Sequence, residues 1–297
     1  MASITGLHTS TTNAVEIPEV WPGLVLEFQK ANLVMANLVE RRDMDVASGG
    51  DIVHFPVTAT EDVVAYTDGK RLTDNLAANT DNEVTLTIDK FYFSGFQIPY
   101  NLQAQSKFDI KADRLRAAGY AIAKQIDTDV ATIGASFSKH IDAGTASATA
   151  QIGDLIIANI IEAYTTLNGN DVPTTDRNWV FDTSAYGELL AMTGNYFISY
   201  DFRQGKPLEN GMIGTILGSP VYQTTNGYAG TGGSPAEATV NNLYFHKQAM
   251  ALAMQVQPDV DMGYDIDTMG ELVNVKTAYG VALLRADFGV VIETVTD

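Results

Sequence analysis

The sequence predicts an α+β fold built for self-assembly, and three observations predict it. Residues 50–96 read as two strand limbs without a core of their own, residues 109–137 read as one long helix, and strands return from Asn242 to the end of the chain. A two-stranded ribbon on its own is at best marginally stable in water. The ribbon therefore needs another surface to lie on, which favours assembly over catalysis.

The two limbs of the ribbon alternate apolar and polar residues, as strands with one covered face do. The apolar residues that share a face within each limb are Val53, Phe55 and Val57, then Val84, Leu86 and Ile88. The polar stretch between the limbs, TDGKRLTDNLAANTDN, contains the turn-like pair Asp68-Gly69. We expect a long β-hairpin.

The long helix is predicted from apolar residues that repeat at helical spacing: Leu115, Ile122, Ile126, Ile133 and Phe137. Asp109 is a suitable N-cap, and several alanines favour helix. Such a helix would be roughly 40 Å long, about twice the ordinary length. It is long enough to support an elongated molecule.

The composition excludes several classes of site. The 297 residues include 18 Lys plus Arg against 36 Asp plus Glu, a net charge of -18, and no cysteine. Without cysteine there is no disulfide, zinc-thiolate site or thiol nucleophile. The negative charge repels phosphate backbones, which argues against a broad nucleic-acid-binding face. No stretch approaches the ~18 apolar residues of a membrane span, so we expect no membrane partner.

No catalytic, cofactor-binding or metal-binding residue is predicted. The four histidines, His8, His54, His140 and His246, stand far apart, and no nucleophile elbow, phosphate loop or dinucleotide fingerprint occurs. Enzymatic activity is therefore not expected, although carboxylate pairs that meet only in the folded chain stay possible.

One dense carboxylate cluster occurs, at Asp259, Asp261, Asp265 and Asp267. A calcium loop that begins at Asp259 would need glycine at its sixth position and glutamate at its twelfth, where Tyr264 and Gly270 stand. The cluster is therefore not an EF-hand calcium loop. A looser divalent-cation site and a solvated turn both stay open.

The order of parts resembles a tailed-bacteriophage major capsid (coat) protein of the Hong Kong 97 type. VWPGLVLEFQKANLVMANLVERRDMDVASGGDIVHFPV is similar to the start of such proteins, QIDTDVATIGA to the end of their spine helix, and TAYGVALLRADFGVVIET to their closing strands. The resemblance implies an N-terminal arm at 1–48, an extended E-loop hairpin at 49–96 and a peripheral (P) domain with the spine helix at 97–149. It also implies an axial (A) domain at 150–260 and P-domain closing strands at 261–297.

The resemblance also implies a function. The chain would be a structural virion protein that self-assembles into hexamers and pentamers, forming an icosahedral head around double-stranded DNA without sequence-specific binding. A separate scaffolding protein and portal would be partners, and assembly would take place in the cytoplasm of the bacterial host. We hypothesise that Lys70 and Arg71, the basic pair of the acidic ribbon loop, form intersubunit charge pairs.

Three alternatives stay open. An encapsulin-like compartment shell would share the fold and enclose protein cargo. Another phage structural protein, such as a tail-tube subunit, would favour a β-sandwich without the long helix. An acidic soluble hydrolase would need a cleft with converging carboxylates.

Overall fold

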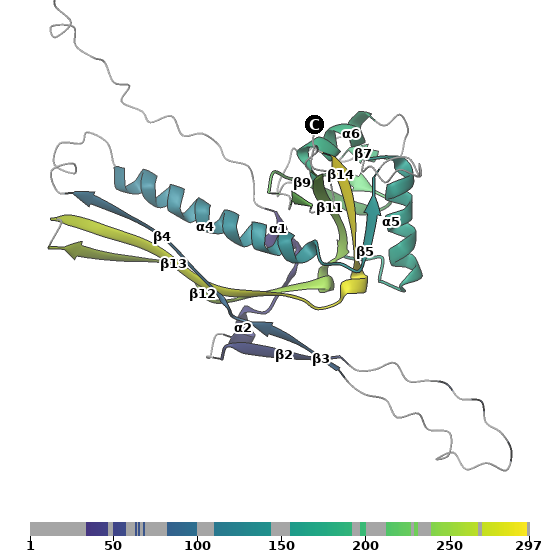
Figure 1. Cartoon of the computed structure of the whole chain (residues 1–297), viewed down its shortest axis with the longest axis horizontal. Coiled ribbons are helices and arrows are strands. Elements are labelled where there is room, and N and C mark those ends of the chain that lie inside the picture. Colours follow the sequence, from purple (N-terminus) through teal and green to yellow (C-terminus); the bar gives the residue numbers. More distant parts are fainter. Residues whose placement is uncertain are drawn as a thin grey trace, which may run out of the picture.

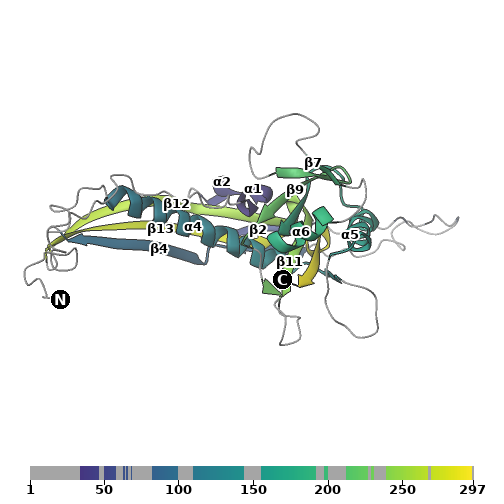
Figure 2. The ribbon, with the colours of Figure 1, turned by 90° about the horizontal axis from the view of Figure 1, so that it is seen from above.

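A computed structural model describes residues 34–46, 50–57, 63, 65, 68, 82–99, 110–143, 155–191, 197–199, 212–226, 229–230, 239–266 and 269–295. The molecule is elongated. A long helix lies on a narrow sheet, a lobe forms around a larger sheet, and a two-stranded ribbon leaves the narrow sheet on the side away from the helix (Figure 1). Seen from above, the helix and the strands beneath it run along the same direction (Figure 2).

The narrow sheet has four strands in the order β1-β12-β13-β4, namely Glu40–Arg41, Met250–Asp265, Gly270–Leu283 and Lys90–Pro99. Helix α4, Ile110–Gly134, covers one face and buries Ala118, Ile122, Ile126 and Val130. The predicted long helix is confirmed. Its apolar stripe is stabilised because it packs against the alternating apolar residues of β13 and β4.

The larger sheet runs in the order β5-β14-β11-β6-β9-β8-β7, and β10 pairs with β11. These strands are Lys139–Asp142, Gly289–Val295, Thr239–His246, Arg177–Asp182, Ser219–Thr224, Met212–Ile216, Phe197–Ser199 and, for β10, Ala229–Gly230. Helix α5, Ile157–Gly169, packs against β5 and β14, while α6, Thr183–Ala191, packs against β6 and β9. Short 3-10 turns, η2 at Lys247–Ala249 and η3 at Ala286–Phe288, connect the two sheets.

The strand pairing corrects our division of the chain near residue 260. Strand β12 begins at Met250, inside the range 150–260 assigned to the A domain, yet it pairs with β13 in the narrow sheet. Strand β14, assigned with β13 to the closing strands 261–297, instead pairs with β11 and β5 in the larger sheet. The reason is burial: Val290, Val291 and Ile292 are consecutive and all fully buried, as in a strand covered on both faces.

The ribbon consists of β2, Ile52–Val57, and β3, Asn82–Thr87, in antiparallel register. We expected it to have no core within its own chain, and at its base this is wrong. Leu86 and Ile88 are buried in a small second core with Val46 and alanines of β12 and β13. The end of the predicted return limb also leaves the ribbon, because β4 pairs with β13 from Lys90 onward.

Two short helices precede the ribbon, α1 at Met35–Leu38 and α2 at Asp43–Val46. Residues 1–33 of the N-terminal arm expected at 1–48 lie outside the described residues. Within the described part of the chain, no helix is both long and apolar enough to cross a membrane.

Candidate assembly surface

The outer sheet face, which we define as the side of the narrow sheet away from α4, exposes large aromatic side chains. Phe91 and Phe93 of β4 are 69% and 76% exposed. They alternate with Tyr92 and Phe96, which pack toward the helix. Because β4 is the last strand of the sheet, this aromatic pair lies beside an edge whose backbone groups have no strand partner among the described residues.

An acidic row runs along the same outer face. Asp259, Asp261 and Asp265 of β12 alternate with residues of the other face, and the register sets Asp259 opposite Lys276. Lys276 Nζ lies 2.5 Å from an Asp261 carboxylate oxygen, and this hydrogen bond raises the pKa of the lysine. Gln97 Nε2 donates to Asp265 at 3.1 Å. The outer face therefore combines an apolar edge with negative charge.

The hairpin that joins β12 to β13 exposes apolar side chains at the far end of the sheet on both of its faces, because the register sets Leu272 on the outer face and Met262 and Tyr264 on the α4 side. Its large exposed side chains are Met262, Tyr264, Ile266, Met269 and Leu272. Large apolar side chains exposed together at one end of a sheet are typical of protein interfaces.

The ribbon also carries an apolar underside, which we define by Val53, Phe55, Val57, Val84 and Leu86. Leu86 is fully buried, and Val53 and Phe55 pack partly against the second core. That core ends there, and Val57 and Val84, further along the underside, remain partly exposed. The ribbon is thus anchored at its base and leaves apolar surface beyond it.

A buried polar cluster joins α4 to the narrow sheet. The Tyr279 hydroxyl donates to Asp129 Oδ2 at 2.7 Å, and Lys90 Nζ lies 3.4 Å from the same oxygen. Gln125 donates to the other carboxylate oxygen at 3.0 Å. Burial, then the hydrogen bond to Asp129 and its negative charge, raise the pKa of Tyr279 well above the ordinary tyrosine value. These contacts fix the helix in register on its sheet.

A second buried carboxylate on α4 holds the start of the described N-terminal segment. Asp127 accepts hydrogen bonds from the backbone N–H groups of Ala36 at 3.0 Å and Val34 at 3.4 Å. Helix α1 has no side-chain cap of its own, so Asp127 satisfies donors that a local N-cap normally would. Burial raises the pKa of Asp127, and these hydrogen bonds offset only part of the effect.

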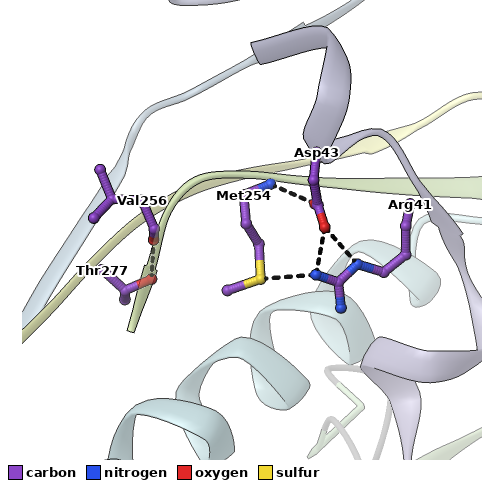
Figure 3. A network of polar contacts seen from close by, with 5 residues as sticks. All are labelled: Arg41, Asp43, Met254, Val256 and Thr277. Carbon is purple, nitrogen blue, oxygen red and sulfur yellow. Dashed lines mark hydrogen bonds and ion pairs between the residues drawn. The ribbon is translucent and has the colours of Figure 1, made fainter. Parts of the chain in front are cut away.

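A third network lies where β12 bends (Figure 3). The register with β13 shifts on both sides of Val256, whose carbonyl accepts from Thr277 Oγ1 at 2.9 Å. Asp43 accepts from the Met254 N–H at 2.9 Å and pairs with Arg41 at 2.6 Å, and Arg41 also contacts the Met254 sulfur. Side chains thereby satisfy backbone groups that the bulged strand leaves without partners.

The structure places the sequence-predicted residues as follows. Lys70, Arg71, Asp267 and His8 lie outside the described residues. His54 and His140 contact Glu83 and Glu293 at 3.2 and 2.9 Å, and His246 accepts from the Gln248 N–H. Over the described residues, no group of three or more His, Asp or Glu side chains could hold a metal ion.

Sequence reasoning missed the buried carboxylates Asp127 and Asp129. One signal was present, because Asp127 lies between the apolar positions Ile126 and Val130 of the predicted helix face. A charged residue on such a face indicates either a boundary of the face or a buried partner. Only the fold shows which partner is present.

Comparison with known proteins gives a consistent result. The family model described as phage capsid protein matches residues 45–295. The chain is similar to a solved structure from Mycobacterium phage Che8, with 25% identity, a TM-score of 0.74, and coverage of 93% of this chain and 96% of that chain. No curated protein matches.

Two further solved structures share the fold. The capsid structure of the cyanophage P-SCSP1u has 18% identity, covers 100% of this chain and 97% of its own, and gives a TM-score of 0.73. The mature capsid of bacteriophage PhiM1 has 14% identity and a TM-score of 0.66, and the match covers 94% of this chain and 92% of that chain.

A spine helix on a narrow sheet, a projecting ribbon and a separate lobe define a shell subunit of the Hong Kong 97-type fold. The chain belongs to the phage capsid protein family. It is a structural protein of the icosahedral phage head, and two expectations from the resemblance, the Hong Kong 97-type fold and this structural role, are confirmed. The 25-residue helix α4 is at odds with the tail-tube alternative.

Proposed function

We propose that this chain assembles into hexamers and pentamers that close an icosahedral head around double-stranded DNA, in which each ribbon lies across the spine helix and narrow sheet of a neighbouring subunit. The observation that carries the proposal is the exposed apolar surface of the narrow sheet, above all Phe91 and Phe93. Fully burying one such side chain stabilises by roughly 1.5–3 kcal/mol, so repeated contacts favour closed shells.

In the same proposal, the P domain comprises β1, β4, α4, β12 and β13, the A domain comprises the larger sheet with its helices, and the E-loop begins at residue 49. A separate scaffolding protein and portal act during assembly in the host cytoplasm. The net charge of -18 disfavours adhesion of packaged DNA, and the subunit performs no chemistry.

The first experiment examines the purified protein by negative-stain microscopy, with and without a co-expressed scaffolding protein. Closed shells without enzyme cargo are expected, and shells that contain protein cargo other than the scaffolding protein would support the encapsulin-like alternative. The double variant Phe91→Ser with Phe93→Ser should keep its thermal unfolding midpoint but lose assembly. Met44→Ser, at a 90% exposed side chain on α2, is the control. Normal shells from the double variant would contradict the proposal.

We also propose that Lys70 and Arg71 pair with the acidic row of a neighbouring subunit. Opposite charge supports this pairing, because Asp259, Asp261 and Asp265 share the face that exposes Phe93. Exposed pairs contribute only ~0–1 kcal/mol each, so their effect comes from repetition and from register.

Charge reversal tests this pairing. Lys70→Glu with Arg71→Glu should lower the yield of closed shells, and Asp259→Arg in the same chain should restore part of it. Lys247→Glu, an exposed change on the lobe, is the control for charge alone. If the reversed pair assembles like the wild type, the assignment of Lys70 and Arg71 is wrong.

A further inference from the structure

The base of the ribbon lies on a surface of very small residues, which we call the alanine surface: Ala251, Ala253, Ala278, Gly280 and Ala282. The register pairs Ala251 with Ala282 and Ala253 with Gly280 across β12 and β13. All four alanines are buried in the second core. Alternation along both strands sets these residues on the outer sheet face, so the ribbon meets almost bare backbone.

Gly280 is the point of closest approach. A Cβ atom added there would lie 2.2 Å from the carbonyl oxygen of Thr87 and 2.9 Å from its carbonyl carbon. Packed sheets ordinarily lie ~10 Å apart with side chains between them. Gly280 has no left-handed backbone angle that would require glycine. What the position requires is therefore space for the ribbon's backbone.

At its base the ribbon is also tied to the sheet by one hydrogen bond, and its two limbs are tied to each other by another. Gln255 Nε2 of β12 donates to the Gly50 carbonyl at 2.9 Å, and the Ile88 N–H donates to the Asp51 carbonyl at 2.8 Å. Leu86, between these ties and the ribbon's free end, is fully buried on the alanine surface. Side-chain insertion, backbone contact and hydrogen bonds together hold the base in one orientation.

We propose that the alanine surface sets the direction in which the ribbon leaves the subunit, with Gly280 as the positioning residue, and that this direction sets the curvature at which subunits join. The proposal rests on the proposed role of the ribbon as an intersubunit contact. Contact of the Thr87 carbonyl with Gly280 fixes the tilt at the base. Because displacement grows with distance from the base, a small change of tilt at the base produces a larger displacement further along the ribbon.

Gly280→Ala tests the proposal, and Gly263→Ala is its matched control. Both positions lie in strands of the narrow sheet, but a Cβ at Gly263 meets nothing within 4 Å. Alanine at 280 must push the Thr87 carbonyl outward by about 1 Å to reach ordinary contact distance. The two variants therefore make the same chemical change and differ only in whether the ribbon has to move.

The first readout is the ribbon's direction in the unassembled subunit. The chain has no cysteine, so nitroxide labels at Thr85→Cys on the ribbon and Lys124→Cys on α4 have no background, and both positions are exposed. Electron–electron distance measurement should show a shifted or broadened distribution for Gly280→Ala and an unchanged one for Gly263→Ala. Identical distributions for both variants would overturn the proposal.

The second readout is the shell. Gly280→Ala should give fewer closed particles of wild-type diameter and more open or aberrantly curved ones, whereas Gly263→Ala should assemble normally. Displaced ribbons with shells of normal diameter and yield would overturn the link to curvature. Failure of the wild type to form any shell would instead contradict the proposed function, so the two failures are distinguishable.

A second variant keeps the test decisive if Gly280→Ala does not fold. Leu86→Ala removes the anchoring side chain without adding bulk, and it should broaden the label distribution and the range of particle diameters. A distribution as narrow as that of the wild type, together with shells of wild-type diameter, would contradict control by the alanine surface.

Discussion

Replacement of Tyr279 by phenylalanine measures how firmly the spine helix is held on its sheet. The change keeps the buried aromatic ring, whose centroid lies 5.9 Å from the centroid of the Tyr92 ring. It removes only the hydroxyl, which donates a hydrogen bond to Asp129 at 2.7 Å. A hydrogen bond to a charged group contributes about 1.5–3 kcal/mol. Lys90, 3.4 Å from the same carboxylate oxygen, remains to compensate its charge. We therefore expect a loss of about 2 kcal/mol in the free energy of unfolding.

The assay is urea-induced unfolding of the unassembled subunit at neutral pH, followed by far-ultraviolet circular dichroism. Tyr264→Phe is the control, because Tyr264 lies in the same sheet but is 66% exposed, and its loss should change stability by less than about 0.5 kcal/mol. If Tyr279→Phe costs no more than the control, the polar cluster does not hold the helix and the reasoning is refuted.

The pH dependence of the same pair gives an independent check. The folded chain raises the pKa of Tyr279, whereas in the unfolded chain the hydroxyl ionises near pH 10. Above about pH 10 the unfolded state therefore loses a proton that the folded state keeps, so the contribution of Tyr279 to stability falls as pH rises. The stability difference between wild type and Tyr279→Phe should narrow in this range.

Two further predictions concern buried contacts. Asp127→Asn keeps an acceptor but removes the buried charge. Because the folded-state pKa of Asp127 is raised, the wild type should gain stability relative to the variant as the pH falls from neutral toward the unfolded-state pKa of about 4, and a pH-independent difference would contradict this. Gly289→Ala would place a Cβ 2.4 Å from ring carbons of Phe137, so unfolding titrations should show a loss of about 1–3 kcal/mol. Gly263→Ala is again the control, and equal stability of the two variants would count against the contact.

The sequence predicted the long helix because its signal is local. Apolar residues repeat over about five turns from Leu115 to Ile133, and the fold buries that stripe against a sheet. The ribbon strands were predicted for the same reason, since alternation within each limb needs no knowledge of a partner. Local periodicity is enough to predict a helix or strand when one face of that element is covered.

Our assignment of both closing strands to one sheet was wrong, because strand pairing joins segments that are distant in the sequence. Strands β13 and β14 are separated only by the turn η3, yet they lie in different sheets. The run Val290, Val291 and Ile292 did carry a signal, because three consecutive buried residues indicate a strand covered on both faces. A sheet with helices packed against it supplies such an environment, and the lobe has one.

The alanine surface and the buried carboxylates could not be predicted, for two physical reasons. Alanine and glycine give a weak apolar signal, so nothing in the sequence distinguishes Gly280 as a contact point. Asp127 and Asp129 have partners 93 and 150 residues away, Val34 and Tyr279, and charged residues on a helix normally face solvent. Contacts between distant segments depend on the assembled fold.

The central claim is that the ribbon of one subunit completes its burial on the next, and a cryo-electron microscopy reconstruction of the assembled shell tests it most directly. The account predicts that the ribbon crosses the spine helix and narrow sheet of a neighbour, and that Phe91 and Phe93, largely exposed in the single subunit, become covered by a neighbouring subunit. Ribbons that contact only their own subunit, with both phenylalanines facing solvent, would contradict it.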